Sequence, residues 1–147
     1  MAVVTFSDKD LRRGTVLSPG WYRVRIDNVG EVPAKASDKG PSTNYPVEGT
    51  VLFNADNGSK VMNKKQDDGS LVEVNLEGLP LDWNFNSKAI GFAVGFLECF
   101  GVKVEKGMRF DLNASAGKEI DVFVENGEWQ GRIVNRVNHK YRTPKAA

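Results

Sequence analysis

Side chains that could bind a polyanion gather near the C-terminal end of the chain. Residues 130–147 read QGRIVNRVNHKYRTPKAA and contain no Asp or Glu. This stretch carries the only histidine, one tyrosine and five basic residues: His139, Tyr141, Arg132, Arg136, Lys140, Arg142 and Lys145. Lys and Arg neutralise phosphates and flat rings stack on unpaired bases, so this mixture is typical of single-stranded nucleic-acid binding.

Residues suited to catalysis or metal binding are few. His139 and Cys99 are each the only residue of their type, and they lie far apart in the sequence. A zinc site needs more Cys and His than this. Asp56, Asp67 and Asp68 lack the spacing of a calcium-binding EF-hand loop. The sequence has neither a Walker A motif nor G-x-G-x-x-G. We therefore expect a protein that is not an enzyme and that binds no metal or cofactor.

The overall composition is that of a globular protein with almost no net charge. The 147 residues include 20 Lys and Arg and 19 Asp and Glu, so polyanion binding must depend on local patches. This length favours one domain with a substantial core. A single cysteine excludes an intramolecular disulfide, and MAVVTFSDKDLRRG lacks the apolar region of a signal peptide. The stretch AIGFAVGFLECFGV is too short to span a bilayer. These features predict a cytoplasmic protein without a membrane partner.

Alternating apolar and polar residues predict strands in the first half of the chain. In WYRVRIDNV the odd positions Arg23 and Arg25 lie on the face opposite Tyr22, Val24 and Ile26. The stretches YPVEGTVLF (45–53) and LVEVNL (71–76) are the predicted second and third strands. Composition predicts an N-terminal arm over residues 1–19 and a loop over residues 33–44.

One helix and a hairpin are predicted in the second half. Ser87 suits an N-cap and Gly101 a C-terminal position, which predicts a helix over residues 87–100 with a broad apolar face. KEIDVFVE and GRIVNRVNHKY are the predicted fourth and fifth strands, joined by a turn at NGEW (126–129), because Asn-Gly is a strong hairpin signal. Three strands, a helix and two strands follow the order of the OB-fold. We expect a mainly β fold, a five-stranded OB-fold-like barrel over residues 20–141, with a short basic tail over residues 142–147.

An OB-fold binds nucleic acid across strands two and three and between the loops that join strands one–two and four–five. The cations expected at this surface in the first half of the chain are Arg23, Arg25, Lys35, Lys39, Lys60, Lys64 and Lys65. The residues expected there from the second half are Phe123, Trp129, Arg132, Arg136, Lys140 and Tyr141. Period two places the cations at 132, 136 and 140 on one face of the fifth strand and turns Phe123 away from the core.

Packing roles compete with binding roles for the aromatic rings. Trp129 can fold over its own hairpin, and Phe123 can pack beneath the N-terminal arm. Four other rings are expected in the core or, for the two tryptophans, against the arm: Trp21, Trp83, Tyr45 and Phe53. The last two share the phase of the apolar residues in their predicted strand.

Two segments resemble parts of a family of phage-encoded single-stranded-DNA-binding proteins. SPGWYRVRIDNVGEVPAKASDKGPSTNYPVEGTVLF is similar to the family's opening, which has Gly-x-Tyr, an alternating strand, a small-polar loop and a second strand of the Val-Glu-Gly type. GKEIDVFVENGEWQGRIVNRVNHKYRTP is similar to its close, with Gly117 and Lys118 in one strand and Asn135 and Val137 in the next. The resemblance covers the layout of residues 18–142.

The resemblance implies an OB-fold protein that coats and protects single-stranded DNA, with little sequence preference, during phage DNA replication or recombination in the host cytoplasm. RNA stays open as a second ligand. Implied protein partners are further copies along the strand and phage replication proteins. The chain ends YRTPKAA, without the acidic tail through which many such proteins recruit partners, so recruitment by a tail is not expected. Two rival functions remain: a phage structural or assembly module that binds protein through the barrel, and an enzyme without recognisable motifs.

Overall fold

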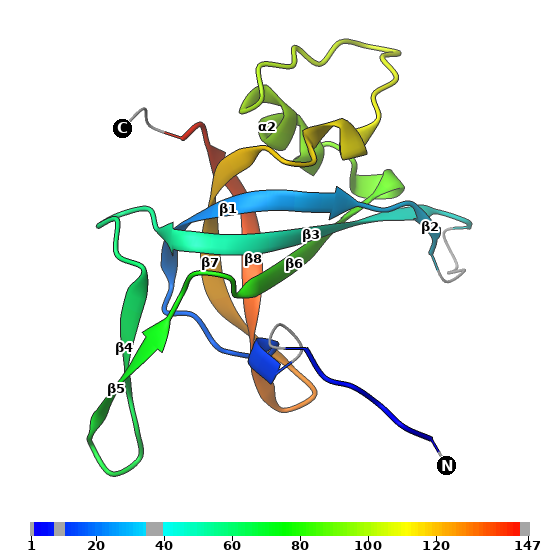
Figure 1. The fold of residues 1–147 in the computed structure, drawn as a ribbon. Helices are drawn as coiled ribbons and strands as arrows, with labels where there is room; N and C mark the ends of the chain where they lie inside the picture. Colours follow the sequence, from blue (N-terminus) through cyan, green and yellow to red (C-terminus); the bar gives the residue numbers. More distant parts are fainter. Residues whose placement is uncertain (1, 8–10, 35–39, 145–147) are drawn as a thin grey trace.

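The computed structural model describes residues 2–7, 11–34 and 40–144 as a mainly β structure with one α-helix in the described part (Figure 1). The strands are β1 (Gly20–Val29), β2 (Val32–Pro33), β3 (Thr43–Asn54), β4 (Val61–Lys65), β5 (Leu71–Asn75), β6 (Pro80–Asn86), β7 (Glu119–Trp129) and β8 (Arg132–Arg142). The helix α2 (Phe92–Glu98) lies between two 3-10 turns, η1 (Ser87–Ala89) and η2 (Leu112–Ser115).

One antiparallel sheet forms the body of the molecule. Its neighbours run β6–β3–β1–β7–β8, and the short β2 continues the pairing of β1 along β3. The β4–β5 hairpin is a separate two-stranded sheet that projects from the body (Figure 1). Among the described residues the outer strands β6 and β8 share no ladder, so the sheet is not closed into a barrel. The prediction of a mainly β fold with one helix is confirmed at this level.

The core lies on the inner face of this sheet, where the predicted alternation is confirmed. Tyr22, Val24 and Ile26 of β1 are at most 1% exposed, and alternate residues of β7 from 120 to 124 are fully buried. Gly49 of β3 has no room for a side chain, since a Cβ there would lie 2.7 Å from Val24 Cγ1 and 2.9 Å from the Leu81 carbonyl oxygen. Glycine at this position therefore allows β3 to lie close to both of its neighbouring strands.

The prediction that residues 71–76 form the third strand of the main sheet is wrong. β5 pairs with β4 in the projecting hairpin, and the strand beside β3 is β6. Leu81, Trp83 and Phe85 of β6 alternate with polar residues and are 3%, 8% and 1% exposed. Pro80 and several asparagines gave this segment the composition of a loop. Proline is tolerated at the first residue of a strand, which is where Pro80 lies.

The helical region is shorter than predicted. It starts with η1, where the Asn86 side chain accepts a hydrogen bond from the Lys88 backbone N–H at 2.9 Å, and the α-helix begins only at Phe92. Ala93, Phe96 and Leu97 are the buried residues of α2. No helix in the described ranges is long and apolar enough to cross a membrane.

The predicted hairpin turn at residues 126–129 is also wrong. β7 continues to Trp129, and Asn126 stays in the ladder opposite Asn135. The turn is formed by Gln130 and Gly131, whose φ angles are 50° and 76°. Positive φ at both central residues is the geometry of the two-residue turn that matches the twist of paired strands.

Part of the expected N-terminal arm belongs to the folded body. Leu17 is 1% exposed, and its backbone N–H donates to Asn135 Oδ1 at 2.8 Å. The Asn135 amide in turn donates to the Thr15 carbonyl oxygen at 2.8 Å. Residues 2–7 are exposed, and they extend away from the body (Figure 1).

Candidate nucleic-acid interface

Two aromatic rings contact each other on the outer face of the sheet, opposite the core. Trp21 of β1 and Phe123 of β7 are direct partners in the ladder, and their ring centroids lie 5.5 Å apart, edge to face. Their strand neighbours, Tyr22 and Val124 among them, are buried, so alternation turns both rings outward. The prediction that Phe123 faces away from the core is confirmed, and its described ring contact is Trp21.

Two cations of β8 lie over these rings. The Arg142 guanidinium carbon is 4.0 Å from the centroid of the Trp21 ring, and Lys140 Nζ is 5.7 Å from the centroid of Phe123. Each such cation–π contact is worth about 0.5–1 kcal/mol at an exposed site. Arg142 Nη2 also lies 3.8 Å from Asp121 Oδ2 and 3.9 Å from Asp56 Oδ1, beyond hydrogen-bond distance in both cases. These contacts hold both cations on the outer face.

The tip of the β7–β8 hairpin is the far end of the same face. Trp129 pairs with Arg132 and is 62% exposed, so it does not fold over its own hairpin. Trp129 and Phe123 are six residues apart on one strand and share a face, which separates them by roughly 20 Å. Between them Arg136 lies across Gly127, where a Cβ would be 2.8 Å from the guanidinium carbon. Gly127 thus makes room for Arg136 and does not form a turn.

We call this surface the β7–β8 strip. It consists of Trp21, Phe123, Trp129, Arg132, Arg136, Lys140 and Arg142. Glu125 lies on the same face, where its Oε2 accepts a hydrogen bond from the Asn138 amide at 2.9 Å. The strip therefore combines four cations with rings at two separated points, an arrangement that can hold phosphates while bases stack.

The prediction that Arg23 and Arg25 contact phosphates is not supported, because both donate hydrogen bonds to carboxylates. Arg23 Nε lies 2.6 Å from Asp121 Oδ1, and the two side chains are only 14% and 4% exposed. Arg25 Nε lies 2.8 Å from Asp27 Oδ1. A buried pair that loses one partner leaves an uncompensated charge, so Arg23 is a structural residue.

The structure does not place Tyr141 on the outer face with the other predicted binding residues. Its ring lies 5.4 Å from Phe96 and 6.4 Å from Trp83, and burial raises the pKa of its hydroxyl. His139, with a φ of 51°, stacks on Phe92 at 4.8 Å, and burial lowers its pKa. Both rings have the phase of Val137, which is 5% exposed, so alternation along β8 turns them toward the helix and leaves the flanking cations outside.

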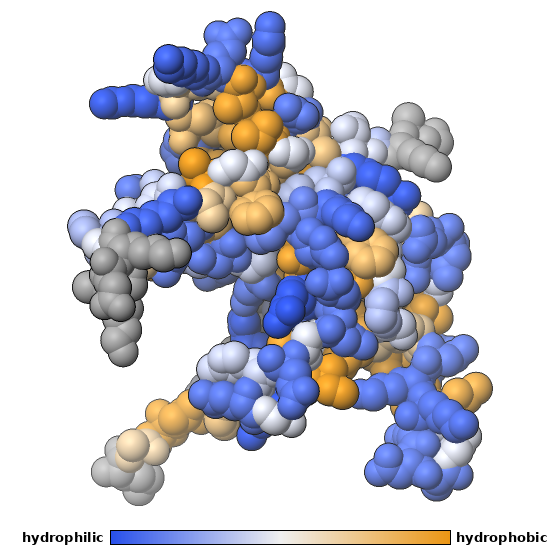
Figure 2. Space-filling view, turned by 180° about the vertical axis from the view of Figure 1, so that it is seen from behind, coloured by the Kyte–Doolittle hydropathy of each residue, from blue (hydrophilic) through white to orange (hydrophobic). Residues whose placement is uncertain are grey.

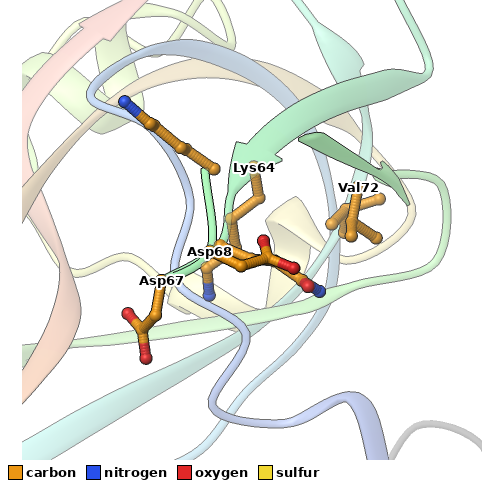
Figure 3. Close-up of a pocket in the computed structure, with 7 residues that line it drawn as sticks. Lys64, Asp67, Asp68 and Val72 are labelled. Atoms are coloured by element: carbon orange, nitrogen blue, oxygen red, sulfur yellow. The ribbon is translucent and has the colours of Figure 1, made fainter. Parts of the chain in front are cut away.

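The lysines of the β4–β5 hairpin lie apart from the strip. Lys60 Nζ pairs with Glu77 Oε2 at 2.9 Å. Lys64 and Lys65 line a groove of about 550 Å³ together with Asp67 and Asp68 (Figure 3). The Ser70 hydroxyl donates to Asp68, which lowers the pKa of that carboxyl. The groove therefore mixes both signs of charge and is not a continuation of the basic strip. The predicted Lys35 and Lys39 lie outside the described residues.

The outer face of β3 and β6, where an OB-fold would bind nucleic acid, is polar and acidic. Glu48 lies opposite Asp82 in the ladder, and Arg13 Nη1 is 2.5 Å from Asp82 Oδ2. Further along, the Asn84 and Asn86 amides both donate to Asn44 Oδ1, at 3.0 and 2.8 Å. A row of this kind offers a phosphate backbone little attraction, which makes the β7–β8 strip the better candidate.

Three residues of the outer face were assigned to other places by the sequence-based prediction. Trp21 has the phase of Arg23, so the period-two argument that turned Arg23 outward applies to it equally. Arg142 was placed in the tail although it continues the spacing of Lys140. Phe53 was expected in the core, but a register shift places it opposite Arg23, whose guanidinium lies 5.1 Å from the ring centroid. The core expectation for Tyr45 is confirmed by its partial burial against the core.

Two observations concern metal binding and the reactivity of the cysteine. The described residues contain no group of three or more His, Cys, Asp or Glu that could hold a metal ion. Burial raises the pKa of the Cys99 thiol, which disfavours the nucleophilic thiolate. No protein-family model and no curated protein matches the sequence of this chain.

Proposed function

We propose that this chain binds single-stranded DNA along the β7–β8 strip, with little sequence preference. The observation that carries the proposal is the placement of three outward-facing rings and four cations on one continuous face, where Trp129 is exposed and Trp21 and Phe123 are half-buried. Trp21 and Phe123 lie beneath Arg142 and Lys140, and Trp129 lies at the far end of the hairpin. Stacking on an aromatic ring is worth about 1–3 kcal/mol per base and tolerates any base, because every base has a flat face.

The strip favours single strands over duplex for a simple steric reason. A base can stack on Trp129 only when it is unpaired and turned toward the protein. Strip cations add a sequence-independent attraction to phosphates. Each phosphate that a cation neutralises contributes about −0.7 to the slope of log affinity against log salt concentration. If each of the four cations neutralises one phosphate, the slope is about −3.

We also propose that the sheet is a modified OB-fold. In support, β1 lies between β3 and β7, β6 follows β3, β8 follows β7, and the helix comes between β6 and β7. The β4–β5 hairpin is then an insertion between the second and third strands. The binding surface proposed here is displaced from strands two and three to strands four and five.

A role in phage DNA replication or recombination in the host cytoplasm is proposed from the resemblance described above. Such a role calls for a protein that covers strands of any sequence, which agrees with a strip of rings and cations. Phage replication proteins remain proposed partners.

Titration of a labelled oligo-dT with the protein tests the proposal. Affinity should exceed that for duplex of the same length, and it should fall with salt. A matched RNA oligonucleotide decides whether the 2′-hydroxyl is tolerated. Equal affinity for duplex and single strand would contradict the stacking part, and a salt slope near zero would contradict the part assigned to the cations.

A further inference from the structure

The apolar N-terminal residues project from the body of the molecule, and most of their surface is exposed to solvent. Val3, Val4 and Phe6 are 80%, 68% and 67% exposed. We call residues 2–6 the apolar arm. Figure 2 shows it as an extended string of apolar residues leaving the body at its lower end. Exposed valines and a phenylalanine in succession are unfavourable in water, which points to a partner surface.

An apolar groove lies at the opposite end of the molecule. α2 and the segment that follows it enclose a space of about 240 Å³. Its lining includes Ile90, Val94, Leu97, Met108 and Phe110. Ile90, Met108 and Phe110 are 44%, 43% and 38% exposed. Figure 2 shows apolar residues gathered at this upper end, so the groove opens on an apolar patch.

The arm does not lie near the groove of its own chain. Figures 1 and 2 are related by a turn about the vertical axis, and in both the arm leaves at the bottom while α2 lies at the top. The chain after the arm is tied to the lower end, where Arg13 pairs with Asp82 and Leu17 bonds Asn135. The groove is therefore accessible to the arm of another molecule.

We propose that the apolar arm of one copy inserts into the α2 groove of a second copy. Phe6 and the valines supply the apolar side chains, and the groove supplies a cavity large enough for side chains but not for a folded domain. Because arm and groove are different surfaces, the contact is head-to-tail and can repeat along a row of copies. A row of this kind suits a protein that covers a long strand.

The biological role of this contact, a row of copies along a strand, rests on the proposed function. The contact itself involves neither the rings nor the cations of the β7–β8 strip. Self-association is therefore measured without nucleic acid. Failure of DNA binding would leave this result unchanged, and failure of self-association would leave strip binding untouched.

Sedimentation velocity of the full chain over a wide concentration range tests the contact. Wild type should form dimers and then longer species as concentration rises. Phe6→Ser in the arm and Met108→Glu in the groove should each weaken association about tenfold or more, as expected for loss of a central apolar contact. Leu71→Ser, which removes an equally exposed residue (67%) from β5, is the matched control and should associate like wild type. The unfolding midpoint of each variant shows that it is folded.

A mixture of the two variants gives the sharpest result. Phe6→Ser retains an intact groove and Met108→Glu an intact arm, so together they should form a heterodimer that does not grow further. Wild type that stays monomeric would overturn the proposal, as would a closed dimer without growth. A mixture that stays monomeric, or Phe6→Ser associating as strongly as Leu71→Ser, would overturn it too.

Discussion

Replacing Trp129 by Ala separates a binding role from a packing role at the hairpin tip. Trp129 is 62% exposed, so a little over a third of its surface is covered in the folded chain. Full burial of an aromatic side chain removes about 150–250 Å² from water. The covered part is thus roughly 60–95 Å², which at about 25 cal/mol per Å² gives an upper bound of about 2 kcal/mol. Alanine keeps some of these contacts, and we expect a loss of about 1 kcal/mol in the free energy of unfolding.

The loss in binding should be larger than the loss in stability. A stacked base is worth about 1–3 kcal/mol, which corresponds to a roughly 5- to 150-fold weaker affinity for oligo-dT. Trp129→Phe keeps an aromatic ring, so this variant should retain most of the wild-type affinity for oligo-dT. Leu71→Ala is the control for an exposed apolar residue of similar exposure and should not change affinity. The measurements are fluorescence anisotropy and thermal unfolding, for which 1 kcal/mol shifts the midpoint by about 2–4 °C. Normal affinity with a midpoint lowered by much more than that would refute the stacking assignment.

Three further predictions concern the strip and the core behind it. Arg142→Ala should weaken oligo-dT binding and make the salt slope less negative by about 0.7, whereas Lys103→Ala on the segment after α2 should leave the slope unchanged. Asp121→Asn removes the buried partner of Arg23, and because Glu119 lies only 3.6 Å from Arg23 we expect a partial loss of about 2 kcal/mol in unfolding free energy. His139 has a lowered pKa in the folded state, so below about pH 6.5 the unfolded chain binds this proton more readily and stability should fall as pH decreases. His139→Gln should flatten that decline in chemical denaturation, and an unchanged pH profile would contradict the burial argument.

Strand alternation explains which parts of the fold could be predicted. Tyr22, Val24 and Ile26 follow a strict period of two, and they are buried as the pattern requires. Leu81, Trp83 and Phe85 follow the same period, but the polar residues and the proline around them (Pro80, Asp82, Asn84 and Asn86) have the composition of a loop. For β6 the apolar period was the stronger physical signal.

A local register defect accounts for one misplaced residue. A single extra residue in β3 turns Phe53 to the outer face beside Arg23, and because it depends on pairing with β1, it leaves no trace in the periodicity of β3 itself. Tyr141 is different, because it has the phase of buried Val137 and the period of β8 already turns it inward, while Lys140 and Arg142 remain outside. Asn126-Gly127 has the form of a turn, but the space taken by Arg136 requires glycine within the ladder.

The comparison of two double variants tests the central claim most directly. Arg132→Ala with Arg136→Ala removes two cations from the β7–β8 strip, and Lys64→Ala with Lys65→Ala removes two from the projecting hairpin. Both pairs are exposed, so folding should be kept in each case. We predict that the strip variant binds oligo-dT more weakly and has a salt slope less negative by about 1.4, while the hairpin variant binds like wild type. Equal losses in the two variants, or a loss confined to the hairpin variant, would contradict the assignment of the strip as the binding surface.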